Sequence, residues 1–512
     1  MFDNFGFIIE RKRELHPKRV ALVEHGKSVS YTYEELDALS NKTAQALVAT
    51  AVKKGDRVMA ILENSAEFFG LLFGCNKIGA VLVPVNFRLS PDELAIIFED
   101  VAPVMLVYQS DYAVKVERLR STMKGSTKFI VVQSGANMPT GDQSFADFVS
   151  VRQDRSPGIR AGGDDPSVIL FTSGSTGKPK GVIQTHRNTF TKSVDHVVDL
   201  APRRDDVLLT MAPVFHVGGL NILTMSMFHV GGSVIVQSRF EPGQALDIIE
   251  SRRVTLLFAI PTMLKMMVAN EGWANHDISS LRYVVSGGEP VPQRIREVFS
   301  EKGVPVLAAY GLTEGSSMSS FQREFDHEGK AADCIGKPPT HLESKVVDEA
   351  GKEVGTGEVG ELIHRGPTVM PGYWNRPEET KSKVKDGWLY TGDLVRKDEN
   401  GFYYLVGRRD DMIKSGGEKI YPSEVEEVIY RHPKVAEVVV FGRPDETWGN
   451  SVWAVVVGKK ESRLSEEEII EYCKRKIAGY KCPRRVILVD EMPHTGSGKV
   501  DRKGVKELYG GH

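Results

Sequence analysis

The feature that most constrains the fold is a repeated switch from short β-branched runs to helical periodicity, which extends from residue 28 to about 310. Parallel strands need crossover connections, which are usually helices, so this alternation predicts an α/β fold built on mostly parallel sheet. The strand-like runs are RVMAIL (57–62), AVLVPV (80–85), VTLLFA (254–259), LRYVVS (281–286) and VPVLAAYG (304–311).

Helix signals lie between these runs. Thr32 and Glu35 form a capping box ahead of a segment whose apolar residues share one helical face. A further helix is expected near 65–79, and others after Pro261 and near 291–302.

The helical signal fades after about residue 341, where Gly-containing turns between short apolar runs predict an appended antiparallel β subdomain. A last α+β unit of about 100 residues begins near 408, with a helix expected to be capped by Ser423 and Glu426. We therefore expect a large N-terminal domain over 1–407, a hinge at 408–411 and a small, mobile C-terminal α+β domain over 412–512.

Charge and hydropathy exclude several classes of protein. The 66 Lys and Arg residues nearly balance the 68 Asp and Glu residues, so nothing draws the whole molecule to nucleic acid. The short basic run at 11–19 gives only weak support for peripheral membrane contact. No apolar run is long enough to span a bilayer, and the first twenty residues lack the order of a secretory signal. These features predict a cytoplasmic protein.

Four cysteines without zinc-site spacing predict reduced, structural thiols. The string GTGEVG (355–360) fits GxGxxG, but no helix follows it, which excludes a dinucleotide site.

The segment VILFTSGSTGKPKGV (168–182) places an apolar strand before a loop of Gly, Ser, Thr and Lys. Glycines let backbone N–H groups approach an anion, hydroxyls donate to phosphate oxygens, and lysines supply positive charge. The spacing of Gly174 and Gly177 is not that of a Walker A loop. Composition alone leaves a phosphate loop and a solvated turn equally open.

The string TSGSTGKPKG resembles the phosphate-binding signature of the adenylate-forming superfamily, which includes acyl-CoA synthetases, peptide-synthetase adenylation domains and luciferases. Six further motifs continue the resemblance in the same order over nearly the whole chain: APVFHVGG (212–219), SGGEP (286–290), YGLTE (310–314), YTGD (390–393), GRRDDMIKSGGEKIYPSEVE (407–426) and GSGK (496–499).

The resemblance implies an ATP site. Tyr310 would pack on adenine, Thr313 would reach phosphate, Glu314 would hold Mg²⁺, and Asp393 with Arg408 would bind ribose. Taken alone, Glu314 fits a solvated loop acid and Asp393 fits an Asx turn. The other residues implied in nucleotide binding are Thr172, Ser173, Gly174, Ser175, Thr176, Gly177, Lys180, Gly288, Glu289, Pro290 and Gly311.

The resemblance also implies how the C-terminal domain acts. Lys499 matches the catalytic lysine that stabilises charge during attack on the α-phosphate. Asp410 matches the hinge residue, with an ordinary surface acid in the charged stretch RRDD as the alternative. The residues expected to line the pantetheine tunnel are Lys414, Ser415, Gly416 and Gly417, which also suit a plain hairpin.

The implied reaction is a two-step ligation in which a carboxylic acid forms an acyl-adenylate with Mg·ATP and coenzyme A then displaces AMP. A ligase that loads a carrier protein, a luciferase-like oxygenase and a silent nucleotide-binding module are the alternatives. The sequence leaves homodimer formation open.

His216 stands where peptide-synthetase domains carry an Asp that grips an amino group, so an acid without an α-amine is favoured, with a core histidine as the alternative. By the resemblance, Phe215–Leu220, Ser286–Gly288 and Ala309–Gly311 line the acyl pocket. Glycines 218, 219 and 311 are expected to leave room there. The sequence thus favours medium- or long-chain fatty acids, with aryl acids such as coumarate or benzoate as the second choice.

Overall fold

The computed structural model describes residues 2–27, 29–122, 127–133, 141–150, 152–158, 161–172, 179–416, 418–459, 462–494 and 500–510. The chain divides into two compact units, Met1–Ser344 with His364–Leu389, and Lys345–Ile363 with Tyr390–His512. Most of the antiparallel segment after residue 341 thus falls in the second unit. The pivot expected at 408–411 stays a prediction.

The first unit holds an eight-stranded sheet that is mostly parallel, as the alternation of strands and helices predicts. Only the two edge strands, β15 and β2, run antiparallel to their neighbours. In spatial order the strands are β15 (Ser317–Phe321), β14 (Val306–Leu312), β13 (Tyr283–Gly287), β12 (Leu256–Ala259), β10 (Val207–Thr210), β11 (Ser233–Val236), β1 (Val20–Glu24) and β2 (Val29–Thr32).

A second sheet in this unit has seven strands, and all its pairings are parallel except that of β8 with β9. In spatial order they are β7 (Gln143–Ser144), β6 (Lys128–Val132), β5 (Met105–Gln109), β3 (Arg57–Ile61), β4 (Val81–Pro84), β8 (Pro166–Thr172) and β9 (Lys180–Thr185).

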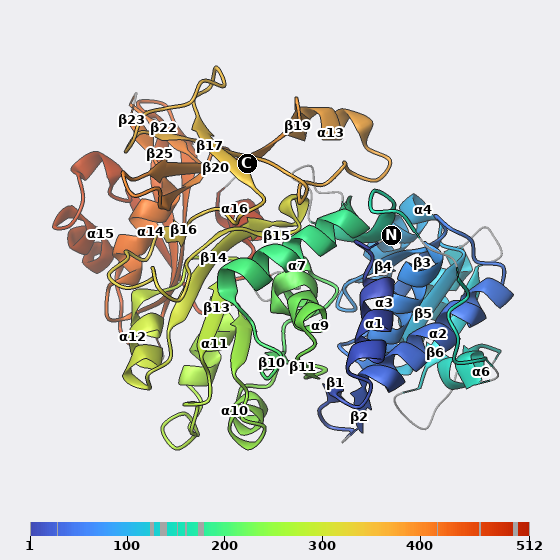
Figure 1. Ribbon diagram of the computed structural model, residues 1–512. Coiled ribbons are helices and arrows are strands. Elements are labelled where there is room, and N and C mark those ends of the chain that lie inside the picture. Colours follow the sequence, from blue (N-terminus) through green and yellow to red (C-terminus); the bar gives the residue numbers. More distant parts are fainter. Residues whose placement is uncertain are drawn as a thin grey trace. The chain divides into compact units, whose positions relative to one another are not determined.

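Helices connect the strands of both sheets (Figure 1). They are α1 (Phe5–Leu15), α2 (Tyr33–Ala49), α3 (Ala66–Ile78), α4 (Pro91–Val101), η1 (Ser110–Tyr112), α5 (Ala113–Thr122), α6 (Phe145–Ser150), α7 (His186–Leu200), α8 (Val217–Leu220), η2 (Asn221–Met225), α9 (Ser226–Val230), α10 (Pro242–Ser251), α11 (Pro261–Val268), α12 (Gln293–Glu301), η3 (Thr313–Gly315) and α13 (Pro377–Lys383). Short strands β16 (Cys334–Gly336) and β19 (Val384–Lys385) complete the set.

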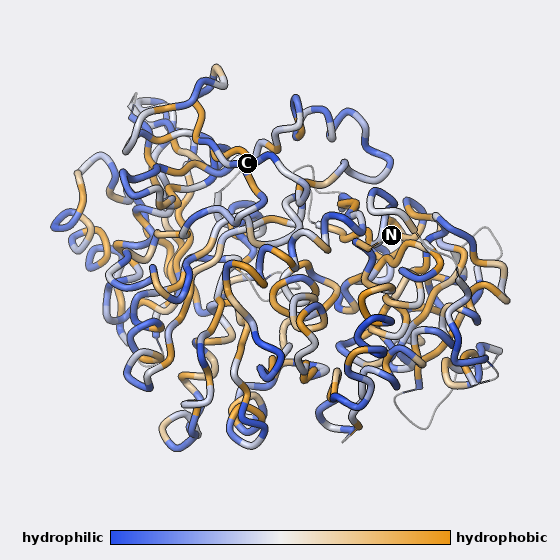
Figure 2. The backbone as a smooth tube through the Cα atoms, in the orientation of Figure 1, coloured by the Kyte–Doolittle hydropathy of each residue, from blue (hydrophilic) through white to orange (hydrophobic). Residues whose placement is uncertain are grey.

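Local sequence signals set two of these helix starts. The Thr32–Glu35 capping box forms as expected at α2, with the side chain of each residue accepting from the backbone N–H of the other. Helix α3 is buried along almost its whole length, and Ser65 caps it by accepting from the N–H of Phe68. Figure 2 shows the apolar character of the buried strands and helices in orange.

The second unit contains antiparallel and mixed sheet with few helices. Three strands lie mostly in this unit, β17 (Glu343–Val347), β18 (Val359–Arg365) and β20 (Trp388–Lys397). Those wholly within it are β21 (Tyr403–Arg408), β22 (Ile413–Ser415), β23 (Glu418–Ile420), β24 (Val435–Asp445), β25 (Gly449–Gly458) and β26 (Arg485–Val489). Its helices are α14 (Pro422–Tyr430), α15 (Glu466–Lys474), η4 (Gly479–Lys481) and α16 (Arg502–Tyr509).

The capping expected from Ser423 and Glu426 is wrong. Tyr421 is the N-cap of α14 and makes no side-chain capping bond. The hydroxyl of Ser423 instead donates to the carbonyl of Val406. The Glu426 carboxylate accepts from the N–H of Val440 and pairs with Arg502. Tertiary partners therefore satisfy both side chains, and Pro422 at the first helical position has no N–H that needs a cap.

The four cysteines are free and buried. Burial raises the pKa of the Cys473 thiol to about 12, which suits a structural role. None of the helices in the described part of the chain has the length and apolarity needed to cross a bilayer.

Candidate nucleotide and acid site

Three of the predicted segments lie at one edge of the eight-stranded sheet. His216 follows the end of β10, the Gly288–Pro290 segment follows β13, and Tyr310 to Glu314 lies at the end of β14. Because β10, β12, β13 and β14 are parallel, their carboxyl ends share an edge. Ligands bind at such edges in open α/β sheets. The fold thus brings to one edge of the sheet the segments predicted to bind the acid and the nucleotide, which lie about 100 residues apart in the sequence.

Glu314 lies in the turn η3 between β14 and β15 and is partly buried. The hydroxyl of Tyr373 donates to its Oε1 atom at 2.6 Å, and the N–H of Met370 donates to its backbone carbonyl at 2.8 Å. A carboxylate held in this way keeps its second oxygen available for a hard cation. The sequence analysis missed Tyr373, because a single tyrosine in a loop forms no motif that would mark it as part of the site.

Tyr373, which contacts Glu314, also lies near Lys180 at the end of the predicted phosphate loop. Lys180 is paired with Thr172 across β8 and β9, and its ammonium lies 5.7 Å from the centre of the Tyr373 ring. The same ammonium forms an ion pair with Glu379. The Lys180 ammonium therefore lies near the tyrosine that contacts Glu314, and Thr172 is on the adjacent strand. Serine 173, Gly174, Ser175, Thr176 and Gly177 lie outside the described residues, as do Gly417 and Lys499.

Two buried polar side chains lie beside strands β14 and β15, which adjoin the segment predicted to bind the nucleotide. The Lys192 ammonium donates to the carbonyl of Met318, which is paired with Gly311 across β14 and β15, and burial lowers the pKa of Lys192 to about 8. Burial also lowers the pKa of His364 to about 3, so its ring is neutral at 6.4 Å from the Tyr310 ring centre.

The expected acid-binding wall is aromatic and closely packed. The rings of Phe215 and His216 have centres 4.5 Å apart, and a Cβ on Gly218 would lie 3.1 Å from ring atoms of Phe258 on β12. A Cβ on Gly219 would collide with the Pro213 carbonyl. One on Gly311 would collide with the Ser317 carbonyl.

The expectation that these three glycines leave room in the pocket is therefore wrong. Glycine 219 and Gly311 let backbone segments approach each other, and the ring of Phe258 fills the space beside Gly218.

The second unit holds the predicted ribose pair. Asp393 on β20 faces Arg408 on β21, and the guanidinium donates to Asp393 Oδ1 at 3.0 Å. The carboxylate is buried, whereas half of the Arg408 side chain is exposed. Glu361, which the sequence analysis missed, stabilises the backbone next to Asp393 and Arg408. Its carboxylate accepts from the N–H of Gly392 and from Arg409.

The segment expected to pivot and the segment expected to contact pantetheine are both at the surface. The Asp410 side chain is 74% exposed, as a hinge residue or an ordinary surface acid would be. Lys414 and Ser415 form β22, and Gly416 follows with a positive φ of 57°. The ring of Trp448 packs where a Cβ on Gly416 would stand, so this turn requires glycine.

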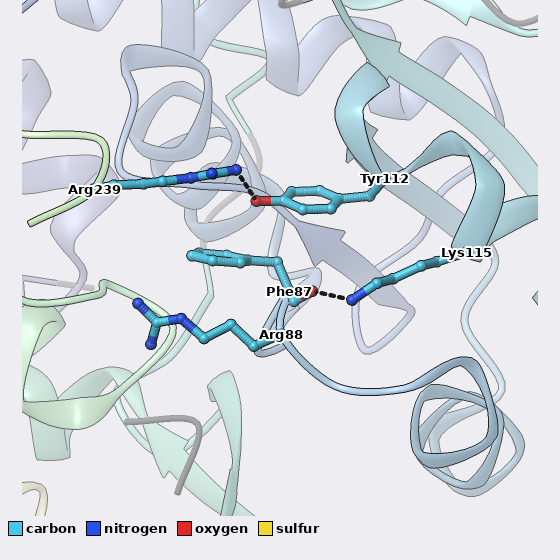
Figure 3. A pocket seen from close by; sticks show the side chains of 5 residues that line it. All are labelled: Phe87, Arg88, Tyr112, Lys115 and Arg239. Atoms are coloured by element: carbon cyan, nitrogen blue, oxygen red, sulfur yellow. Dashed lines mark hydrogen bonds between the residues drawn. The ribbon is translucent and has the colours of Figure 1, made fainter. Parts of the chain in front are cut away.

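The first unit also contains a cationic cavity of about 270 Å³ that sequence reasoning missed. Its lining residues are Phe87, Arg88, Tyr112, Lys115 and Arg239 (Figure 3). The rings of Phe87 and Tyr112 stack with centres 5.3 Å apart. Burial and the nearby Arg239 lower the pKa of Arg88. The Arg239 guanidinium is already paired with the buried carboxylate of Glu63, so the positive charge around the cavity comes mainly from Arg88 and Lys115.

Comparison with known proteins identifies the family. The family model described as AMP-binding enzyme matches residues 9–374, and that of the AMP-binding enzyme C-terminal domain matches 424–499. A feruloyl-CoA synthase from Amycolatopsis sp is 35% identical over 500 residues, covering 98% of each chain. The long-chain-fatty-acid–CoA ligase FadD13 of Mycobacterium tuberculosis is 33% identical over 509 residues, covering 99% of this chain and 98% of that protein.

Among solved structures, the anthranilate CoA ligase AuaEII in complex with anthranoyl-AMP matches with a TM-score of 0.91 at 28% identity, covering 99% of this chain and 97% of that one. The chain belongs to the AMP-binding enzyme family, within the adenylate-forming superfamily. It is an AMP-forming acid–thiol ligase that uses ATP, Mg²⁺ and coenzyme A.

Proposed function

We propose that this enzyme converts an aryl-containing carboxylic acid into its coenzyme A thioester. In the first step a carboxylate oxygen attacks the α-phosphorus of Mg·ATP, and the P–O bond to pyrophosphate breaks. In the second step the thiol of coenzyme A attacks the acyl carbon, AMP leaves, and the thiol proton is released. The aromatic wall of Phe215, His216 and Phe258 is the observation that carries this choice of acid.

The physical reason is shape and contact. Aromatic rings bury a large flat area, and offset or edge-to-face ring pairs gain about 0.5–1.5 kcal/mol beyond that burial. An acid with a ring can use the three side chains in this way. A long flexible alkyl chain would instead need open space, and Phe258 fills the space beside Gly218 where the sequence had predicted room. The feruloyl and anthranilate ligases among the relatives support an aryl acid, whereas FadD13 supports the fatty-acid alternative.

A pyrophosphate-release screen tests this proposal. We expect kcat/KM for cinnamate-like or benzoate-like acids to exceed that for octanoate and hexadecanoate by about tenfold or more. Phe258→Ala should bring the two kcat/KM values closer together, because removing the ring beside Gly218 makes room for the aliphatic acids and raises their kcat/KM. A parent enzyme that prefers hexadecanoate would overturn the aryl assignment. Omitting coenzyme A should stop turnover after the adenylate; turnover only with an added carrier protein would favour the carrier-loading alternative.

We assign the roles of the site residues as follows. Glu314 would hold Mg²⁺, Asp393 and Arg408 would bind ribose, and Lys499 would stabilise charge at the α-phosphate. The segment from Lys414 to Gly417 would then contact pantetheine after the C-terminal domain pivots at Asp410. The buried Asp393 carboxylate beside Arg408 supports the ribose assignment, because a carboxylate offers two acceptor oxygens to a diol.

The cationic cavity supports coenzyme A as the acceptor, since its nucleotide end carries three phosphate groups and a flat base. Arg88→Ala should raise the KM for coenzyme A about tenfold by removing a charge-assisted hydrogen bond, while the KM for ATP in pyrophosphate exchange stays unchanged. Arg118→Ala, which removes an exposed arginine from α5, is the matched control. A KM for coenzyme A that stays at the parent value in Arg88→Ala would argue against this role for the cavity.

A further inference from the structure

The turn that carries Glu314 has a strained backbone. Ser316 and Ser317 directly follow η3 and have φ angles of 60° and 104°. Residues other than glycine rarely adopt this region, because the Cβ atom crowds the backbone there, so both serines are strained. Such a conformation persists only where the surroundings hold it in place. The contacts around Thr313–Ser316 therefore decide where the Glu314 carboxylate lies.

Two buried amide side chains hold the two ends of this turn. Gln184 on β9 is fully buried, and its Nε2 donates to the carbonyl of Thr313 at 3.3 Å. Asn221, which begins η2, is 1% exposed, and its Nδ2 donates to the carbonyl of Ser316 at 3.2 Å. The second hydrogen of Asn221 Nδ2 goes to Gln184 Oε1 at 3.0 Å, which joins the two side chains.

The orientation of both amides follows from their partners. The two turn carbonyls can only accept, so the nitrogen of each amide must face the turn, and the Gln184 oxygen is left to accept from Asn221. A further bond joins the hydroxyl of Ser316 to the carbonyl of Thr368 at 2.7 Å. The turn is thus fixed through its backbone and through the Ser316 hydroxyl. The Glu314 carboxylate is not used to hold the turn, so it can accept from Tyr373 and bind a ligand.

We propose that Gln184 and Asn221 are positioning residues that preset Glu314 for Mg²⁺, an inference that rests on the proposed metal role of Glu314. Neither side chain reaches the carboxylate itself; both act on the backbone at either end of the turn. Asn221 lies five residues after His216, so the same side chain joins the acid-binding segment to the metal-binding turn. Without this pair, the strained turn would relax and the carboxylate would be held less closely in the position that a cation needs.

The Mg²⁺ dependence of pyrophosphate release tests this inference. We expect Asn221→Ala to raise the Mg²⁺ concentration for half-maximal rate about tenfold, with a smaller fall in kcat at saturating Mg²⁺. Gln184→Met keeps the length of the side chain and leaves the bond from Asn221 to Ser316, so a smaller shift is expected. If Asn221→Ala does not fold, the Mg²⁺ dependence of Gln184→Met tests the inference instead. Because both residues hold one turn, the double variant should shift Mg²⁺ dependence by less than the sum of the single effects.

Asn41→Ala is the matched control, because Asn41 on α2 is almost as buried as Asn221 and its side-chain amide donates to Asp37 of the same helix. It should lower the melting temperature without changing Mg²⁺ dependence. If Asn221→Ala and Gln184→Met also change only the melting temperature, the two residues are merely structural and the inference is overturned. Glu314→Gln separates this outcome from failure of the proposed site: if that variant too keeps the parent Mg²⁺ dependence, the metal role of Glu314 is wrong.

Discussion

Replacing Lys499 with alanine is expected to slow acyl-adenylate formation about a thousandfold, because a positioned charge at the reacting phosphate is among the largest single contributions to catalysis. Thioester formation from preformed acyl-adenylate should stay within about threefold of the parent rate, since the thiol attacks the acyl carbon in that step and no bond to phosphorus forms or breaks. Pyrophosphate exchange measures the first step, and single-turnover reaction of isolated acyl-adenylate with coenzyme A measures the second.

The control for this prediction is Lys503→Ala. Lys503 is an exposed lysine on α16 that pairs with Glu507 at 3.7 Å, so its loss removes the same charge near the end of the chain. Both half-reactions should keep the parent rates in that variant. Equal loss of both half-reactions in Lys499→Ala would refute the proposal that Lys499 serves adenylation alone. It would also remove the reason for the C-terminal domain to present different residues in the two steps.

Glu314→Gln is expected to lower the rate of adenylation about a hundredfold at a fixed, low Mg²⁺ concentration. Glutamine keeps the shape of the side chain and an oxygen that can accept from Tyr373, so the substitution removes the charge with little change in packing. The triphosphate then loses the carboxylate that helps to hold its cation. The rate of pyrophosphate release as a function of Mg²⁺ concentration measures this effect, and added Mg²⁺ should restore part of the rate.

Tyr373→Phe separates the charge of Glu314 from its orientation. Removing the hydroxyl deletes one hydrogen bond to the carboxylate and leaves the ring near Lys180, so the rate should fall only about three- to tenfold. If Tyr373→Phe lowered the rate as much as Glu314→Gln does, the orientation of the Glu314 carboxylate would account for most of its effect, and its charge would add little. A Glu314→Gln enzyme with unaltered Mg²⁺ dependence would contradict the metal assignment.

Motifs with strong local geometry could be predicted from the sequence. The Thr32–Glu35 capping box and the strands at 57–62 and 281–286 follow from patterns within a few residues. The capping at Ser423 and Glu426 could not be predicted, because Val406, Val440 and Arg502 compete for the same side chains from distant positions.

The acid pocket shows the same limit. Glycines in the segments around His216 and Tyr310 indicated open space, but a glycine can serve a cavity or a close backbone approach equally well. Only the packing of Phe258 against Gly218 distinguishes these two uses. The cationic cavity was missed for a related reason: Phe87, Tyr112 and Arg239 come from three separate segments with no shared pattern.

The sequence by itself determined the class of enzyme and the residues expected to touch ATP, through motifs that resemble those of the adenylate-forming superfamily. Such motifs can be recognised in a sequence because their chemical groups lie within a few residues of one another. Tertiary structure alone decided which side chains hold Glu314 in place and what fills the acid-binding wall. Those contacts join residues as far apart as Gln184 and Thr313, and the free energy of such a contact depends on distances that no local pattern encodes.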